Sequence, residues 1–470
     1  MTSPSSLWLA AADWIARASR CAALGAIVGG AACFGSCISA SAWTKPGNTI
    51  VVDEANGPGA QFTDIPDAVA AAAPGDLVLV RPGEYSSFLV NKAITILGAP
   101  NGAARVARPS SLPVSIVGGI PAGEVAVIAD LAFPATLSVW GAKGTVAVDG
   151  CSIGRLIVPL ADDVRVYRAA HIGRVEVQRS HVEIVSSSVG GGDVYLSLKS
   201  HELGVWGSIT TQSHAEHAWP SVAMRDQSKL ICALTSVRGR HLYWTAWGVI
   251  SLQLPMTEGT SAISVQGLST LALIGTAKDV VRGADATLQP GVSYWYGSNP
   301  NQRSGGHGVE LDSGQAARSG VQLIGGVGGP VDFYILILVP WFTYDGAPVS
   351  GADEAKLVEI TPDNPTLELL DTPVPGSKVR LRVRGPANSQ VKVEYGAPTI
   401  VPVSATRPIE TLVAVTGSTQ SGALPSSGEL TFDLDIDPAV EPGWHVFLQA
   451  RLTLPSGAVR VSNSVLLVAR

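Results

Sequence analysis

The sequence predicts an all-β protein in which a parallel β-helix with an N-terminal capping helix is followed by a C-terminal β-sandwich domain. Glycine occurs 51 times and proline 31 times in 470 residues, while charged residues make up only 15%, which favours short strands and tight turns over long solvated helices. Short alternating apolar runs also recur along the chain. Their steps lie within the roughly 20 to 45 residues typical of stacked repeats.

The first 42 residues have the features of an export signal. Arg17 and Arg20 precede an apolar run of small residues over 21–38, and Ala40-Ser41-Ala42 supplies the small residues that a signal peptidase reads. We therefore expect cleavage after Ala42, a secreted or cell-surface location, and no transmembrane segment in the mature chain.

Two alternatives stay open for this region. The apolar run could remain as an uncleaved membrane anchor. Lipid attachment at Cys37 is the second alternative, because Phe34-Gly35-Ser36-Cys37 resembles a bacterial lipobox except at its first position.

Cleavage after Ala42 would leave two cysteines, Cys151 and Cys232. Export would permit them to form a disulfide. We favour the alternative that both are small buried hydrophobic residues inside strands.

The stretch 61–100 indicates a short helix followed by tightly spaced strands. Asp64 can cap a helix that ends at Pro74-Gly75. Its apolar positions share one face: Ile65, Ala68, Val69 and Ala72. Strand-like runs separated by turn residues follow at 77–80, 88–90 and 94–97. Because this spacing leaves no room for helices between the strands, we predict a coil of short strands whose open end is covered by the helix.

This stretch resembles the N-terminal cap and first coil of pectin-lyase-like right-handed parallel β-helix proteins. The resemblance covers about forty residues and rests on Phe62, Ile65, Ala68, Val69, Pro74-Gly75-Asp76, Val78, Val80, Pro82-Gly83, Tyr85 and Ile94-Thr95-Ile96. It implies a right-handed parallel β-helix, which we place over 43–330. It says little about activity, because one fold serves many functions.

Degenerate repeats support a solenoid further along the chain. Apolar-x-apolar strands followed by a short polar turn begin at Val146, Val175, Leu196, Val222 and Ile263. In such a coil the inward residues stack about 4.8 Å apart on their equivalents one rung away. We expect the outer face to be flat and polar.

The character of the sequence changes after residue 330. We predict a connecting strand and linker over 331–351 and a β-sandwich module over 352–470, because about seven alternating strands with Pro/Gly turns follow. The ending from Pro442 resembles modules on uncharacterised secreted proteins of planctomycete-like bacteria. That resemblance implies no activity.

The charge balance argues against a nucleic-acid partner. The formal net charge is −6, whereas binding to phosphates needs a basic face. A local basic stretch is interrupted by acidic residues, and we interpret it as a solvated face: Arg155, Arg165, Arg168, Arg174 and Arg179.

Candidates for catalysis are few. A lyase acting on acidic polysaccharide needs clustered carboxylates for calcium and a basic residue, and only Asp162, Asp163 and Arg165 approach this pattern. A polygalacturonase-like hydrolase needs an acid and a base, with a helper histidine such as His307 in Gly306-His307-Gly308, but the Asn-Thr-Asp and Arg-Ile-Lys companions are missing. These four residues remain candidates for catalysis.

Histidines are concentrated between His171 and His241. His181 and His201 occupy equivalent positions after serines, which fits either a polar ladder at a turn or stacked metal ligands. His214 and His217 have metal-like spacing without a third ligand. We favour the ladder and expect no metal and no cofactor.

Two aromatic groups are candidates for ligand binding, because sugar rings stack on aromatic faces. They are Tyr243, Trp244 and Trp247, and Tyr294, Trp295 and Tyr296. Packing inside the fold is the alternative for both groups.

We therefore expect an exported cell-surface or secreted protein with a structural or glycan-binding role, and a polysaccharide or cell-surface glycan as its partner. A polysaccharide lyase or glycoside hydrolase acting on an acidic polysaccharide is the alternative. Whether the protein is an enzyme stays open.

Overall fold

Strands form most of the regular structure in the computed structural model. It describes residues 36–100, 103–108, 112–191, 193–198, 220–246, 256–285, 305–328, 345–351, 356–360, 364–399 and 412–470. Within these ranges the helical segments are α2 (Ile65–Ala71) and the 3-10 turn η1 (Ala40–Ala42). The unit that carries the fold is Cys37–Arg470. None of the described helices is long and apolar enough to cross a membrane.

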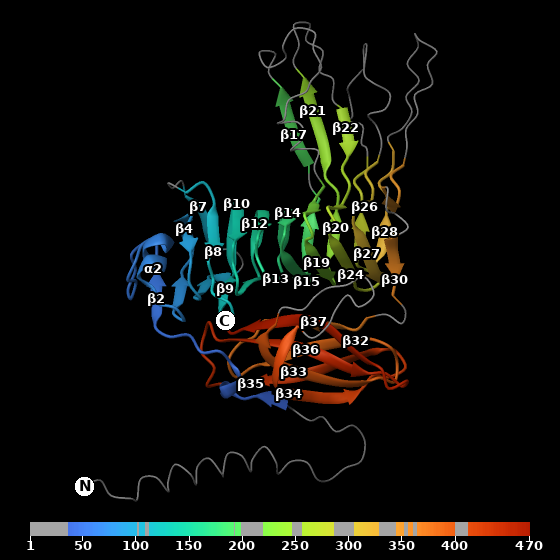
Figure 1. Ribbon diagram of the computed structural model, residues 1–470. Helices are drawn as coiled ribbons and strands as arrows, with labels where there is room; N and C mark the ends of the chain where they lie inside the picture. Colours follow the sequence, from blue (N-terminus) through green and yellow to red (C-terminus); the bar gives the residue numbers. More distant parts are fainter. Residues whose placement is uncertain are drawn as a thin grey trace, which may run out of the picture. The chain divides into compact units, whose positions relative to one another are not determined.

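Two long parallel sheets share most of the strands before residue 360 (Figure 1). From residue 77 to residue 359 the chain passes through one or two strands of one sheet before each return to the other, which is the winding of a parallel β-helix-like solenoid. The 11-stranded sheet contains, in order, β2 (Thr49–Val52), β3 (Leu77–Val80), β6 (Thr95–Gly98), β9 (Val125–Ala129), β11 (Thr145–Asp149), β13 (Asp163–Tyr167), β15 (His181–Val185), β19 (Lys229–Ala233), β24 (Thr270–Ile274), β27 (Gln315–Ser319) and β30 (Leu357–Glu359).

The second sheet has 15 strands arranged in two rows. Both rows share β10 (Leu131–Trp140), β12 (Ser152–Pro159) and β14 (His171–Gln178). One row adds β4 (Gly83–Ser86), β7 (Ala104–Arg108), β16 (Ser188–Gly190), β20 (Ser236–Arg238), β25 (Val280–Arg282) and β28 (Gln322–Ile324). The other adds β5 (Leu89–Val90), β8 (Ser115–Gly118), β18 (Val222–Arg225), β23 (Ile263–Gln266), β26 (Val309–Asp312) and β29 (Val349–Ser350).

Glycines allow close backbone contact where the shared strands pass from one row to the other. A Cβ on Gly154 would lie 2.2 Å from the carbonyl oxygen of Pro134, and one on Gly173 would lie 2.4 Å from that of Gly154. Any side chain here would force the strands apart.

The inward residues of the 11-stranded sheet stack in register from rung to rung. One such column contains Val146, Val164, Val182, Leu230, Leu271 and Ala316. All six are buried in the continuous apolar core of the solenoid. Full burial of a Val or Leu side chain contributes about 1.5–3 kcal/mol, so this column is a main source of stability.

The capping helix α2 forms as the sequence predicts. The carboxylate of Asp64 accepts hydrogen bonds from the N–H groups of Ile65 and Ser86, both at 2.9 Å, which ties the helix start to the first coil. Ile65, Ala68 and Val69 are buried against the solenoid core.

One predicted repeat does not belong to the solenoid. Val175, Val222 and Ile263 are direct register partners. Leu196 instead lies on β17 (Asp193–Leu198), which forms a separate three-stranded sheet with β21 (His241–Ala246) and β22 (Met256–Gly259). Its alternating pattern resembles that of the coils, but its partners are different strands.

The C-terminal domain is a sandwich of two four-stranded sheets. One contains β1 (Ser36–Ile38), β35 (Glu429–Ile436), β32 (Lys378–Arg384) and β31 (Thr366–Leu369). The other contains β34 (Val413–Ala423), β33 (Gln390–Pro398), β36 (His445–Thr453) and β37 (Val459–Val468). Neighbouring strands whose registers are defined run antiparallel and enclose a second apolar core.

Two predicted boundaries differ from the structure. The strand expected to open the sandwich is β30, which pairs in parallel with β27 and therefore extends the solenoid. The leader assigned to residues 1–42 overlaps β1 and η1, which belong to the described fold. Residues 331–344 of the expected linker lie outside the described part of the chain.

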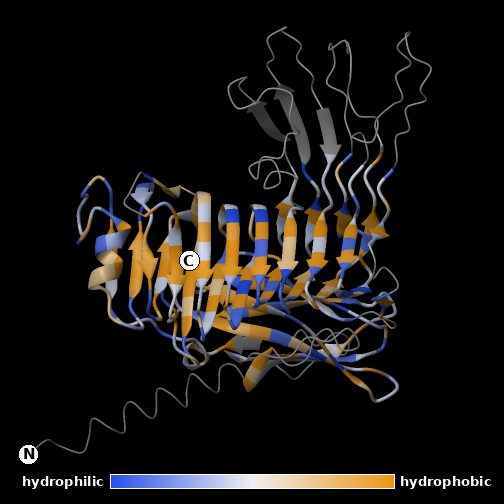
Figure 2. Ribbon diagram, turned by 45° about the horizontal axis from the view of Figure 1, so that its top comes forward, coloured by the Kyte–Doolittle hydropathy of each residue, from blue (hydrophilic) through white to orange (hydrophobic). Residues whose placement is uncertain are grey.

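The expectation of a polar outer face is wrong for the 11-stranded sheet. Apolar residues run along the strands of the solenoid (Figure 2). The outward residues form one buried cluster with the C-terminal domain, made up of Leu77, Leu97, Val127, Ala129, Ala147, Tyr167, Val185, Ile231, Ala233, Ala272 and Ile274 together with Leu412, Val413, Phe447, Leu466 and Val468. The C-terminal domain therefore covers this face.

Candidate functional site

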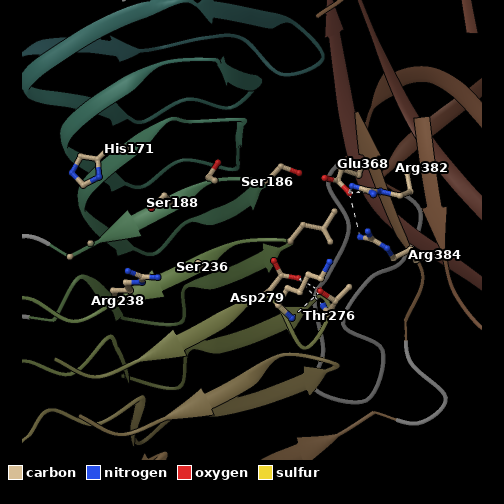
Figure 3. A pocket seen from close by; sticks show the side chains of 15 residues that line it. His171, Ser186, Ser188, Ser236, Arg238, Thr276, Asp279, Glu368, Arg382 and Arg384 are labelled. Atoms are coloured by element: carbon tan, nitrogen blue, oxygen red, sulfur yellow. Dashed lines mark hydrogen bonds and ion pairs between the residues drawn. The ribbon is translucent and has the colours of Figure 1, made fainter. Parts of the chain in front are cut away.

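A cleft of about 780 Å³ lies between the solenoid and the C-terminal domain. Figure 3 shows His171, Ser188 and Arg238 on the solenoid side, and Arg382 and Arg384 on the C-terminal domain. Hydroxyl groups and charged side chains make up most of its lining.

The solenoid wall of the cleft is built from turns that repeat on successive coils. Ser186 and Leu234 each adopt a left-handed backbone conformation, with φ of 50° and 51°. The N–H of Ser186 donates to the carbonyl oxygen of Ala233 at 2.9 Å, and the N–H of Leu234 donates to that of Ile274 at 2.8 Å. Because the turns stack in this way, equivalent side chains on neighbouring coils line the same wall.

Some hydroxyls of these turns hold the structure and others face the cleft. The hydroxyl of Ser187 donates to the carbonyl oxygen of Val185 at 2.9 Å and accepts from the N–H of Ala169 at 3.0 Å. It therefore holds the turn in place. Ser188 and Ser236 are register partners on β16 and β20. The side chain of Ser188 is exposed and available to a ligand.

Arg238 and Lys278 provide the available positive charge on the solenoid wall. Both side chains are exposed. Among the described residues no carboxylate pairs with either of them, in contrast to most arginines of this protein. They can therefore bind an anionic ligand without first breaking an ion pair.

The opposite wall carries a network of ion pairs across β31, β32 and β35. Arg382 lies 2.7 Å from the carboxylate of Glu368, and Arg384 lies 3.3 Å from it. Arg384 also pairs with Glu429 at 2.8 Å. Cross-strand register places these residues opposite one another, so the arrangement is rigid.

The cleft has an excess of positive charge. Four cationic side chains line it, Arg238, Lys278, Arg382 and Arg384, against two carboxylates, Asp279 and Glu368. Asp279 accepts hydrogen bonds from the N–H and hydroxyl of Thr276, at 2.8 and 2.9 Å. Since both carboxylates already hold partners, the geometry suits recognition of an anion better than acid–base chemistry.

Two of the predicted catalytic residues lie at a covered interface instead of in a groove. Arg165 is 1% exposed and Asp163 is 7% exposed. The guanidinium of Arg165 donates to Asp163 at 3.0 Å and to the carbonyl oxygens of Leu412 and Thr399, both at 2.9 Å. These contacts join the solenoid to the C-terminal domain and leave no room for a substrate.

The other two catalytic candidates lie far from each other. Asp162 pairs with Lys143 at 3.3 Å near the surface. His307 precedes β26 and accepts a hydrogen bond from the N–H of Ala347 at its Nδ1 atom, at 2.9 Å. The coil of His307 lies four rungs from the coil of Asp162 along the solenoid, a distance of about 19 Å at the usual strand spacing. The structure therefore does not bring the four candidates together.

The basic stretch is not a solvated face. Arg168 pairs with the buried carboxylate of Asp149. Arg155 and Arg174 both pair with Glu176, at 2.6 and 3.2 Å. Most of these arginines neutralise carboxylates within the fold.

The predicted ligand-binding aromatics lie mostly beyond the described residues. Tyr243 and Trp244 are on β21. Trp247, Tyr294, Trp295 and Tyr296 fall outside the described part. Their role in ligand binding stays a prediction.

His181 belongs to a ladder of polar residues, but its register partner on the next coil is Lys229 and not a histidine. The Nδ1 atom of His181 lies 3.1 Å from the carbonyl oxygen of Asp162, and burial lowers the pKa of this histidine. His201, His214 and His217 lie outside the described residues. In the part of the chain that the structure describes, no cluster of His, Cys, Asp and Glu could hold a metal ion.

The two cysteines of the solenoid behave as buried hydrophobic residues. Cys151 and Cys232 are both buried and free, as we favoured, although only Cys232 lies inside a strand (β19) and Cys151 lies between β11 and β12. Burial raises the pKa of each thiol to about 12. Neither thiol is a nucleophile near neutral pH.

The cleft could not be found from motifs. Ser186-Ser187-Ser188 directly after an apolar strand marks a hydroxyl-rich turn. However, Arg382 and Arg384 meet this turn only through the docking of the C-terminal domain. The chain matches no protein-family model and shows no significant similarity to a curated protein.

Proposed function

We propose that this protein is an exported binding protein of the cell surface or extracellular space that holds an acidic glycan in the cleft. The observation that carries the proposal is the pair of exposed cations Arg238 and Lys278 beside outward hydroxyls. A uronate sugar offers a carboxylate to the cations and ring hydroxyls to Ser188 and its neighbours. The export signal in the sequence supports the proposed location.

The cleft lies beside a rigid repetitive scaffold, which supports binding over catalysis. Its carboxylates, Asp279 and Glu368, already accept hydrogen bonds or pair with cations. A lyase or hydrolase would need a base and an acid aimed at one sugar bond. The cleft side chains instead provide positive charge and hydroxyl groups, which bind without reacting.

Binding is tested with a uronate polymer, its carboxyl-reduced counterpart and a neutral glucan, by affinity electrophoresis and calorimetry. We expect retention of the uronate polymer alone, with affinity that falls as salt rises. The same mixtures are assayed for unsaturated and reducing ends. Product formation, or equal binding of the reduced polymer, would overturn the proposal.

Charge-neutral variants locate the binding site. Arg238→Gln and Lys278→Gln should each weaken binding about tenfold, since a charge-assisted hydrogen bond contributes about 1.5 kcal/mol or more. Arg179→Gln and Lys143→Gln are the matched controls, because both remove an exposed cation outside the cleft. Equal losses of binding affinity in all four variants would indicate that the polymer is attracted to positive charge anywhere on the surface.

A further inference from the structure

The chain enters the C-terminal domain before it enters the solenoid. Strand β1 pairs with β35. The N–H of Ala40 donates to the carboxylate of Asp437 at 3.2 Å. Thr44 and His445 form an antiparallel bridge, with N–H to carbonyl distances of 2.8 and 3.2 Å in the two directions. Residues 38–44 are therefore an integral edge of the C-terminal domain.

Side chains of this segment fill the core of that domain. Ile38 is 1% exposed and Trp43 is 5% exposed. Both belong to the apolar cluster of the sandwich, and Ala40 and Ala42 pack against it. Lys45 extends the contact, with its ammonium group 5.4 Å from the ring centre of Trp444.

Cleavage after Ala42 is hard to reconcile with these contacts. It would remove Ile38 and leave an apolar cavity, and it would unpair the edge of β35. It would also make Trp43 the first residue, next to a free ammonium group. The tripeptide Ala40-Ser41-Ala42 is the 3-10 turn η1, held by the N–H of Ala42 donating to the carbonyl oxygen of Ser39 at 2.9 Å.

We infer that the export leader is removed upstream of Ile38, after Gly35 or Ser36, and that 38–44 stays in the mature protein as a structural strand and turn. Cys33 and Gly35 supply small residues at the third and first positions before a cut after Gly35. A cut after Ser36 would begin the mature chain at Cys37, which is also the first residue of the compact unit. This inference is independent of glycan binding.

The cleavage position is read directly on the exported protein. The full chain is expressed in a bacterial host with a general secretory pathway, and the mature form is characterised by intact mass and N-terminal sequencing. A chain that begins at Ser36 or Cys37 is expected, with or without added mass on Cys37. A mature chain that begins at Trp43, or a chain that keeps its leader, would overturn the inference.

A second experiment measures what the segment contributes to folding. Chains that begin at Cys37 and at Trp43 are compared by thermal unfolding, and the shorter chain should melt lower by about 5 °C or more. Ile38→Ala in the longer chain should lower the melting temperature in the same direction. Ser39→Ala is its control, because Ser39 is exposed. Equal melting of both chains, or of Ile38→Ala and the unmodified longer chain, would contradict the structural role.

Discussion

Glu183 on β15 accepts two hydrogen bonds from Ser464 on β37, one from its N–H at 2.9 Å and one from its hydroxyl at 2.5 Å. The two residues lie 281 positions apart, so this contact is one of the links between the solenoid and the C-terminal domain. Tyr167 and Arg165 also bond the hydroxyl of Ser464, at 2.7 and 3.2 Å. The network is buried, and its loss would leave charged groups without partners.

Removing the side chain of Glu183 should therefore destabilise the folded protein. Glu183→Ala removes the acceptor of both the Ser464 N–H and the Ser464 hydroxyl, and it removes an acidic group near the buried guanidinium of Arg165. We expect a loss of about 3 kcal/mol in the free energy of unfolding, measured in urea. Glu124→Gln, at an exposed turn, should change it by less than about 0.5 kcal/mol. A result for Glu183→Ala within that control range would show that the network is not needed for stability.

The buried carboxyl group of Asp130, which pairs with Arg470, makes stability depend on pH. The guanidinium of Arg470 lies 2.5 Å from Asp130 and 2.8 Å from Asp149. Burial raises the pKa of Asp130 from 3.8 to about 6, although Arg470 acts in the opposite direction. Between about pH 4 and 6 the folded state thus binds more protons at Asp130 than the unfolded state does, so its contribution to stability falls as pH rises.

Asp130→Asn removes this titration and keeps a residue that tolerates the positive φ of 55°. The stability of the variant relative to the natural protein should rise by about 2.4 kcal/mol from pH 4 to pH 7. Urea unfolding at pH 4, 5, 6 and 7 measures the difference. A difference that does not vary with pH would refute the assignment.

Leu268 has a strained backbone conformation, and its replacement should stabilise the protein. Its φ is 60° and its side chain is 68% exposed, so it bears the left-handed conformation without a compensating apolar contact. Leu268→Asn should stabilise the protein by about 1 kcal/mol in thermal unfolding. Val459→Asn, at a strand position that is 52% exposed, controls for removal of a surface apolar group and should not stabilise. Equal effects of both substitutions would rule out backbone strain as the cause.

The thiols of Cys151 and Cys232 should resist labelling in the native state. Their raised pKa and complete burial keep them protonated and inaccessible. Incubation with iodoacetamide at pH 8 followed by peptide mapping should show modification of both residues only after urea is added. Native labelling at either position would mean that the coil opens locally.

Local patterns predicted the elements that local interactions determine. Helix α2 follows from the cap at Asp64 and from apolar residues on one face, and β3 and β6 follow from apolar runs between turns. The prediction of a polar outer face is wrong because apolar and polar residues do not alternate in these strands. In the runs 77–80 and 270–274, apolar residues occupy both faces, which is typical of strands buried on both sides.

The candidate site depended on contacts that no local pattern contains. Asp163 and Arg165 resemble a catalytic pair in sequence, yet Leu412 and Thr399 cap the guanidinium from the other domain. Arg382 reaches the cleft for the same reason. Only the docking of the two domains decides which charged residues meet solvent.

The pairing of β1 with β35, two strands far apart in the sequence, affects the order in which parts of the protein can fold. Ala40 and Asp437 are 397 positions apart in the chain, so the sandwich is incomplete until the last strands have been synthesised. Contacts of such high sequence separation slow folding, because the entropy of a very large loop is lost before they form. A nascent chain therefore exposes the apolar side chain of Ile38 throughout synthesis, and a holding chaperone would have to shield it until the C-terminal strands arrive.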